Sequence, residues 1–167
     1  TFLIVGCLGG LFTLSSCTAP TNVKDYSAYV NPFIGTGGHG HTFPGAVVPH
    51  GMIQPSPDTR IDGWDACSGY YYADSTINGF SHTHVSGTGC CDYGDVLLMP
   101  TVGKQQYRTT DPQSQRLAYA SSFSHKNEIA EPGYYSVFLD TYQVKAEISS
   151  TKRGAIHRYT FPENTES

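Results

Sequence analysis

Two histidines, His82 and His84, stand two residues apart in the segment GFSHTHVSGTGCCDYGDVLLMP at residues 79–100. Residues two apart in a strand project from the same face, so this spacing could present both imidazoles to a metal ion or a polar ligand. His39 and His41 have the same spacing but lie in a glycine-rich loop. One interpretation is a zinc site. The alternative is hydrogen bonding of the imidazoles to hydroxyl or backbone groups, because no carboxylate or cysteine stands at a familiar ligand spacing.

The same segment also carries carboxylates and cysteines. Asp92 and Asp95 could give oxygen ligands to calcium or accept hydrogen bonds from sugar hydroxyls. Carboxylates at the entrance of a strand often cap backbone amides instead. Cys67 could form a disulfide with Cys90 or Cys91 in an exported protein, and the alternative is three buried, reduced cysteines. A nucleophilic cysteine would need a paired base, and none stands at a recognisable position.

Trp64, the single tryptophan, stands in the turn-like sequence Asp62-Gly63-Trp64-Asp65. A large ring in this context is expected to be exposed, and its face can stack on a pyranose ring. Glycoside hydrolysis also needs two carboxyl groups around the scissile bond. The fourteen acidic residues form no recognisable pair of this kind. The catalytic groups of a glycosidase would therefore lie outside this chain.

Strands and turns must position these side chains. The 167 residues are 38% apolar and 13% aromatic, which is enough for the core of one compact domain. Twelve tyrosines, eight phenylalanines, eighteen glycines and ten prolines favour strands and turns, and no window has the period of a long amphipathic helix. We therefore predict an all-β fold. The net charge of -4 leaves no basic stripe, which excludes nucleic acid as the expected partner.

The C-terminal half has the most regular pattern and predicts an antiparallel meander. Val144, Ala146 and Ile148 alternate with Lys145 and Glu147, as in a strand with one buried and one wet face. The strands expected in this half are residues 119–125, 133–139, 142–149 and 155–161. Shorter strands are expected at residues 29–34, 69–73, 79–85 and 95–99, and five prolines predict an irregular segment through residue 57.

The N-terminus predicts export. Residues 2–14 form a mostly apolar run that is too short to span a bilayer and is typical of a signal-peptide core. The run meets Leu14-Ser15-Ser16-Cys17, which is similar to a bacterial lipobox, so Cys17 is the predicted lipidation site. The alternative is an ordinary secretory signal with an incidental cysteine.

We expect three parts in this chain. Residues 1–17 would be a lipoprotein signal peptide, truncated at its front, and residues 18–28 a tether. Residues 29–167 would be a β-sandwich domain that is incomplete at its C-terminal end. The predicted protein is a bacterial lipoprotein of the periplasm or cell surface, which contacts the membrane through its lipid anchor alone.

Four stretches resemble the family 92 glycoside hydrolases, which are secreted, calcium-dependent exo-α-mannosidases. They are VNPFIGTGGHGHTFPGAVVPHGMIQPSPDTR at residues 30–60, GWDACSGYYY at residues 63–72, the segment at residues 79–100, and GAIHRYTFP at residues 154–162. The motifs are long, occur in this order and cover most of residues 29–162. The resemblance is therefore specific.

This resemblance implies an antiparallel β-supersandwich, like that of galactose mutarotase-like proteins, followed in the whole enzyme by an (α/α)6 barrel. The whole enzyme would remove terminal α-linked mannose from glycans, such as N-glycans, with inversion, and a calcium ion would bind the 2- and 3-hydroxyls of the mannose. The general acid and base would belong to the barrel. This chain alone would then be inactive and would form one wall of the substrate cleft.

The resemblance also implies which residues line that wall. Trp64 is the expected aromatic contact on the leaving-group side of the sugar. The other expected sugar-binding residues lie in the glycine loop and in the histidine segment: Gly37, Gly38, His39, His82, His84 and Asp92.

Two further functions remain open at this point. The chain could be a stand-alone carbohydrate-binding module of a surface glycan-capture system, or a sandwich from a glycan-releasing amidase. An open reading frame that continues for several hundred residues into a helical domain would favour the mannosidase over the module. Release assays on a glycopeptide would distinguish the amidase.

Overall fold

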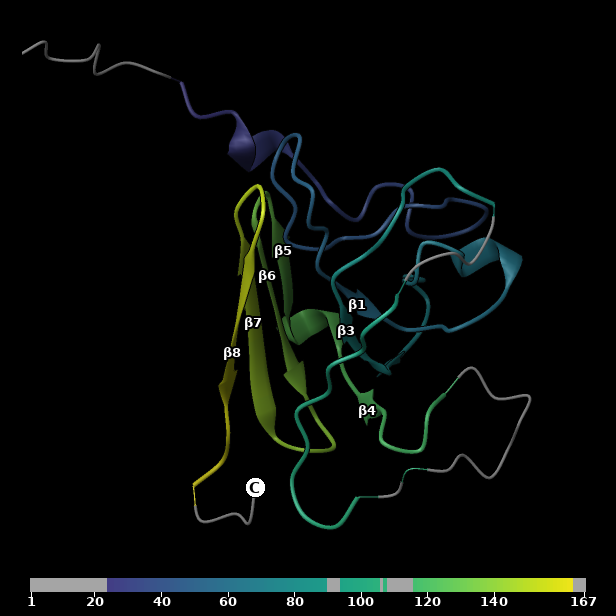
Figure 1. Cartoon of the computed structure of the whole chain (residues 1–167), viewed down its shortest axis with the longest axis vertical. Coiled ribbons are helices and arrows are strands. Elements are labelled where there is room, and N and C mark those ends of the chain that lie inside the picture. Colours follow the sequence, from purple (N-terminus) through teal and green to yellow (C-terminus); the bar gives the residue numbers. More distant parts are fainter. Residues whose placement is uncertain (1–23, 90–93, 106, 108–115, 164–167) are drawn as a thin grey trace, which may run out of the picture.

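The computed structural model describes residues 24–89, 94–105, 107 and 116–163. Within them the chain is all-β and antiparallel, as predicted, and has two layers (Figure 1). One layer is a four-stranded sheet. The other consists of two short ladders, ordered loops and 3-10 turns. The described part contains no helix that is long and apolar enough to cross a membrane.

The four-stranded sheet is the predicted meander. Its strands follow one another in space as they do in sequence: β5 (Glu128–Glu131), β6 (Tyr134–Leu139), β7 (Val144–Ser150) and β8 (Ala155–Thr160). The tight turns between them place Gly133 (φ 77°) and Gln143 (φ 54°) in the left-handed region. The strands predicted at residues 133–139, 142–149 and 155–161 are confirmed.

Strand β5 was not predicted, because its apolar pattern is inverted. Glu128 is buried, with 8% of its surface exposed, whereas its neighbour Ile129 is 51% exposed. Periodicity places the apolar residue inside, so the sequence of this strand reads as polar and irregular. The neighbours that make Glu128 acceptable inside come from distant parts of the chain.

One face of the meander forms the core of the domain. The cross-strand pairs Tyr135–Ile148, Val137–Ala146 and Leu139–Val144 bring the apolar side chains of β6 and β7 together. They pack against buried apolar residues of the second layer, which are Ala46, Ile77, Phe80 and Phe123. The predicted burial of Val144, Ala146 and Ile148 is confirmed.

The outer face of the meander differs from the prediction at Glu147, which is 7% exposed instead of wet. Arg158 on the neighbouring strand donates two hydrogen bonds to its carboxylate, of 2.8 and 2.7 Å, and Tyr134 Oη donates a third of 2.8 Å. The hydrogen bonds from Arg158, then Tyr134 and Lys145, lower the pKa of Glu147 to about 2. A charged group can therefore be covered here by its own partners.

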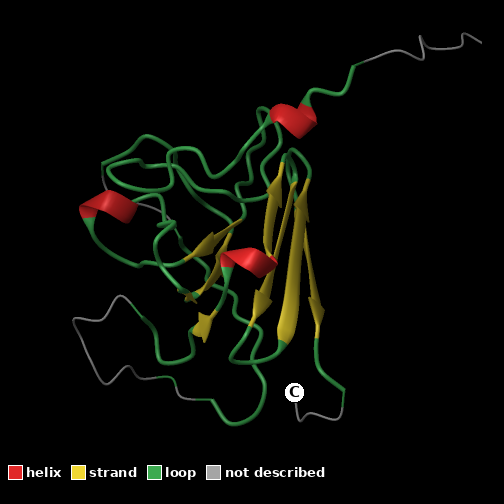
Figure 2. Ribbon diagram, turned by 180° about the vertical axis from the view of Figure 1, so that it is seen from behind, coloured by secondary structure: helices red, strands yellow, loops and turns green. Residues whose placement is uncertain are grey.

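The second layer lies against the inner face of the meander (Figure 2). In it β1 (Ser56–Asp58) pairs with β3 (Gly79–Ser81), and β2 (Thr76–Ile77) pairs with β4 (Ser121–Ser122). The 3-10 turns are η1 (Ser27–Tyr29), η2 (Trp64–Ala66) and η3 (His125–Asn127). Turn η2 lies on the side of this layer that faces away from the sheet (Figure 1).

Several predicted strands are shorter or absent. Residues 29–34 form turns, because the Asn31 side chain accepts a hydrogen bond of 3.0 Å from the Phe33 amide and closes the backbone locally. Residues 69–73 are a loop. Strand β3 ends at Ser81, β4 keeps two residues of the expected 119–125, and residues 95–99 contribute one isolated bridge from Leu98 to Phe80.

Glu128 joins the two layers. Its carboxylate accepts hydrogen bonds from Tyr135 Oη at 2.6 Å and from Tyr70 Oη at 3.0 Å, and His125 Nδ1 lies 2.5 Å from it. Burial, together with the negative charge of Glu128, raises the pKa of both tyrosines. The site-bearing layer is thus fixed to the sheet by polar contacts as well as by apolar packing.

Candidate functional site

Trp64 opens η2 and is 65% exposed, as predicted for a sugar platform. Gly63, with φ 107°, precedes it in a conformation that favours glycine. The ring of His41 meets Trp64 edge-on at 5.2 Å, and a Cβ on Gly89 would lie 2.5 Å from the indole Cη2. His41 and the bare backbone of Gly89 therefore hold the indole while most of its surface stays open.

The glycine loop reaches the same place. Gly40 lies so close to Gly35 that a Cβ on it would stand 2.0 Å from the Gly35 carbonyl oxygen, and Thr42 donates its amide to that oxygen. This closure lets His39 reach η2, where its Nδ1 lies 2.7 Å from Asp65 Oδ1. The hydrogen bond and charge of Asp65 raise the pKa of His39. The structure thus brings the predicted residue His39 to the loop that carries Trp64.

Of the two predicted glycines, Gly38 has a positive φ of 60° and Gly37 accepts the amide hydrogen bond of Gly40 at 3.0 Å. A Cβ on Gly38 would meet nothing within 4 Å. This glycine is therefore required by the turn and leaves the surface beside His39 unobstructed.

His84 is buried and lies in a polar cluster at the base of the site. Its Nε2 lies 2.8 Å from Asp58 Oδ1 and its Nδ1 lies 2.7 Å from the Gln54 carbonyl oxygen. Burial lowers the pKa of His84, but the hydrogen bond and charge of Asp58 and the bond to Gln54 outweigh it and raise the pKa overall. Both ring nitrogens therefore face oxygen atoms, those of a carbonyl and of a carboxylate.

The same cluster contains Ser81 but is not a nucleophilic triad. In such a triad the serine and the carboxylate contact opposite nitrogens of the histidine. Here Ser81 Oγ, at 3.1 Å, and Asp58 share the Nε2 side of His84, and Ser81 donates to Asp58 at 2.7 Å. Ser81 is also fully buried. The cluster therefore clamps β1 to β3 and orients the loop after β3.

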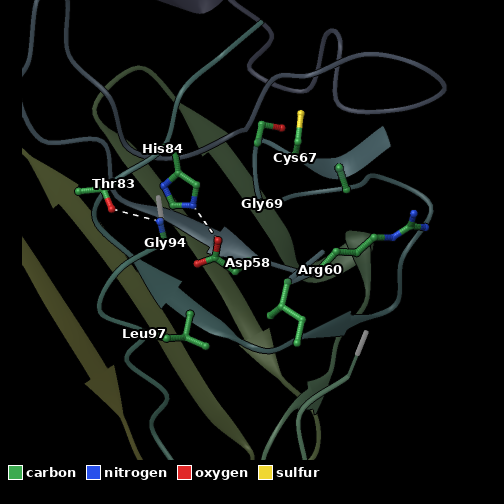
Figure 3. Close-up of a pocket in the computed structure, with 11 residues that line it drawn as sticks. Asp58, Arg60, Cys67, Gly69, Thr83, His84, Gly94 and Leu97 are labelled. Carbon is green, nitrogen blue, oxygen red and sulfur yellow. Dashed lines mark hydrogen bonds and ion pairs between the residues drawn. The ribbon is translucent and has the colours of Figure 1, made fainter. Parts of the chain in front are cut away.

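A small cavity of about 110 Å³ lies beside this clamp (Figure 3). Asp58, His84 and Thr83 line it on one side, and Cys67 and Gly69 on the other (Figure 3). Small-molecule sites usually have 300 to 1,000 Å³. This cavity has room for a few water molecules but not for a sugar ring. We therefore take the open surface around Trp64, and not this cavity, as the candidate sugar site.

His82 and His84 do not share a face, which corrects the sequence prediction. Because β3 ends at Ser81, the chain turns before His82, and its ring meets His157 on β8, with 2.5 Å between the two Nε2 atoms. His84 points instead to Asp58. The predicted pairing of His82 with His84 is replaced by two separate histidine sites.

The cysteines and carboxylates of the segment are only partly described. Asp92, Cys90, Cys91 and Cys17 lie outside the described residues. Cys67 is buried, has no disulfide partner among the described residues, and donates its thiol to the Thr88 carbonyl oxygen at 2.8 Å. Asp95 accepts a hydrogen bond of 2.8 Å from the side-chain hydroxyl of Thr83.

Three site residues were missed by sequence reasoning: Asp58, His41 as a support of Trp64, and Asp65 as the partner of His39. His39 and Asp65 are 26 residues apart, as are His84 and Asp58. Such spacings carry no periodic signal. Asp65 could have been suspected from its place next to Trp64, whereas Asp58 stands among prolines in a segment that reads as irregular.

Comparison with known proteins gives consistent matches. Residues 29–167 match the Glycosyl hydrolase family 92 N-terminal domain. A family GH92 α-mannosidase of Bacteroides thetaiotaomicron, solved in complex with mannoimidazole, is 47% identical over 82% of this chain with a TM-score of 0.76. A GH92 inverting mannosidase of the same organism is 34% identical over 86% of the chain, with a TM-score of 0.69.

A curated relative, an uncharacterised secreted glycosidase of Arthroderma benhamiae, is 32% identical over 143 residues, which is 84% of this chain. The chain spans 18% of the length of that glycosidase and 18% of the α-mannosidase. The similarity therefore concerns one part of much longer proteins.

Proposed function

Because this chain belongs to glycoside hydrolase family 92, we propose that it is the N-terminal part of an exported glycosidase that releases terminal α-linked mannose from glycans with inversion. The observation that carries the proposal is the 47% identity, with a TM-score of 0.76, to a family 92 α-mannosidase. The relative named as an inverting mannosidase supports the stereochemistry. The relative named as a secreted glycosidase supports export.

In this proposal the chain supplies one wall of the substrate cleft. The exposed face of Trp64 stacks on the sugar on the leaving-group side, because an indole face offers apolar contact to a pyranose ring. His39, held by Asp65, and the open backbone at Gly38 give the polar rim of this wall. Gly37 belongs to the same rim, and Asp92 joins it from outside the described residues. His84 positions the loop after β3 from below.

We propose that the described residues do not by themselves perform hydrolysis. Asp58 is buried between Ser81 and His84, and Glu128 is buried among two tyrosines and a histidine. Neither is free to protonate a leaving group or activate water. We therefore propose that the general acid and base, which an inverting glycosidase needs on opposite sides of the bond, belong to the remainder of the protein, and that this chain alone is inactive.

Calcium is part of the proposal, but the described residues do not fit it. They contain no group of three or more His, Cys, Asp or Glu side chains that could hold a metal ion. Calcium takes six to eight oxygen ligands, mostly carboxylates and carbonyls. We therefore propose that its ligands lie outside the described part of this chain. Anchoring through a lipid on Cys17 is the last element of the proposal.

The decisive experiment measures mannose release by the full-length protein. We expect cleavage of an α-mannoside but not of a β-mannoside, loss of activity after chelation, and recovery with added calcium. A full-length protein that binds mannan without cleaving it would favour the second candidate, a carbohydrate-binding module. The exposure of Trp64 fits that candidate too.

The sugar-wall assignment has its own test, the variant Trp64→Ala in the full-length protein. We expect it to reduce kcat/KM on a mannose-containing glycan by roughly tenfold, which corresponds to an aromatic contact of about 1.4 kcal/mol. Cleavage of an activated aryl mannoside, which lacks the leaving-group sugar, should change much less. Equal losses on both substrates would remove Trp64 from the leaving-group side.

A further inference from the structure

The pair of imidazoles formed by His82 and His157 lies apart from the contacts of Trp64 and has no part in the proposed sugar wall. The Nε2 atoms of the two rings are 2.5 Å apart, and their ring centroids are 4.7 Å apart. His157 belongs to β8, opposite Ile148 of β7, whereas His82 follows β3. The pair therefore bridges the sheet and the second layer.

Burial disfavours the protonated form of both rings. Burial, and then the charge of His84, lowers the pKa of His82. Burial, and then the charge of His82, lowers the pKa of His157 to about 4. Neutral imidazole nitrogens are good ligands for zinc and need not lose a proton on binding.

Tyr159 supports His157 from behind. Its hydroxyl lies 2.7 Å from Nδ1 of His157, and the ring of Phe80 meets the same imidazole edge-on at 6.4 Å. Histidines that bind metals usually place their second nitrogen against an oxygen, which fixes the tautomer and the ring. With a metal on Nε2, the ring hydrogen of His157 sits on Nδ1 and is donated to Tyr159, so the proton count of the pair does not change.

We propose that His82 and His157 form a two-histidine site for one Zn²⁺ ion, completed by water molecules. Nitrogen ligands suit zinc and exclude calcium, which requires oxygen. Zinc bonds of about 2.0–2.1 Å in a tetrahedral arrangement separate the two nitrogens to roughly 3.4 Å. The rings must therefore open by less than about 1 Å, and His82, in the loop after β3, can supply this movement.

The expected consequence is a cross-link between the two layers. Zinc that binds the folded protein and not the unfolded one raises the apparent stability in proportion to the logarithm of its concentration. The site is distinct from the proposed calcium site, because its two protein ligands are both in the described residues and are both nitrogen atoms. Because the protein supplies only two ligands, we expect the affinity of this site for zinc to be lower than that of a four-ligand structural site.

The test is a calorimetric titration of the purified full-length protein with zinc chloride at pH 7, with thermal unfolding measured in parallel. We expect binding of a zinc equivalent that disappears in both His82→Gln and His157→Gln. It should persist in the matched control His39→Gln, which removes an exposed imidazole that also has a close partner. Excess calcium should not displace this zinc.

Two outcomes would overturn the site: no zinc binding by the parent protein, or a zinc equivalent that persists in either variant. If His157→Gln does not fold, His82→Gln decides the question, because His82 is half-buried and lies in the loop after β3. Copper(II) bound to the parent protein gives a second readout, since coupling to two imidazole nitrogens in its electron paramagnetic resonance spectrum is expected and coupling to one would contradict the pair.

Discussion

Replacing Glu128 by Gln should destabilise this domain by about 3 kcal/mol, although the side chain keeps its size. The carboxylate contacts three groups from different elements: Tyr70 Oη, Tyr135 Oη and His125 Nδ1. Gln replaces one of its two acceptor oxygens by an NH2 group. The NH2 group cannot accept a hydrogen bond, so one of the three contacts loses its acceptor, and the remaining oxygen is neutral.

The magnitude follows from these contacts. A hydrogen bond to a charged group contributes about 1.5–3 kcal/mol and one to a neutral group about 0.5–1.5 kcal/mol. The two bonds that become bonds to a neutral oxygen lose about 1 kcal/mol each, and the contact that loses its acceptor adds about 1 kcal/mol. Water cannot replace the weakened tyrosine contacts, because Tyr70 and Tyr135 are fully buried. The expected shift of the unfolding temperature is roughly 6–12 °C for a chain of this size.

Urea unfolding followed by circular dichroism measures this change, and Glu131→Gln at the other end of β5 is the matched control. Glu131 is exposed, so its replacement should stay within about 0.5 kcal/mol. Tyr70→Phe, combined with Glu128→Gln, should cost less than the sum of the two single changes, because both remove the same bond. Equal stability of the Glu128 and Glu131 variants would contradict the role of Glu128 in joining the two layers.

Two further predictions concern the site and the sheet. Gly89→Ala should displace the indole of Trp64, because the added Cβ would lie 2.5 Å from Cη2. Trp64 is the single tryptophan, so the fluorescence maximum and its quenching by acrylamide report this movement directly. An unchanged spectrum would contradict the contact. The folded-state pKa of Glu147 is about 2, below the ordinary glutamate pKa of 4.5, so the unfolded state takes up the proton first and stability falls as pH drops from about 4.5 to about 2. Glu147→Gln should flatten this part of the stability profile, and an unchanged slope would show that Arg158 does not hold the carboxylate.

The sheet could be predicted because its signal is local. Val144, Ala146 and Ile148 alternate within one strand, and short turns link the strand to neighbours adjacent in sequence. The same rule failed for β5, where Glu128 points inward, and for Glu147, which is covered on the outer face. In both strands the buried carboxylate is stabilised by partners that no periodic pattern reveals.

The site could be predicted only where one residue carries the signal by itself. The exposure of Trp64 followed from its turn context, and the glycine loop from its composition. The partners of the histidines could not be deduced, because His84 meets Asp58 and His82 meets His157, 26 and 75 residues away. The expected same-face arrangement of His82 and His84 assumed a strand, and the end of β3 at Ser81 removed that assumption.

The two layers also differ in the order in which the chain supplies them. The meander is built from contacts between neighbours in sequence, which form quickly, whereas the loops around Trp64 and His84 precede it and depend on it. Tyr70 must find Glu128 58 residues later, and Ala46 accepts a hydrogen bond from Ser150, 104 residues later. During synthesis the site-bearing segment therefore emerges before the strands of the meander, against which its apolar residues pack in the folded protein. Its many prolines and glycines keep this segment poor in long apolar strands, which limits its association with other chains before the sheet arrives.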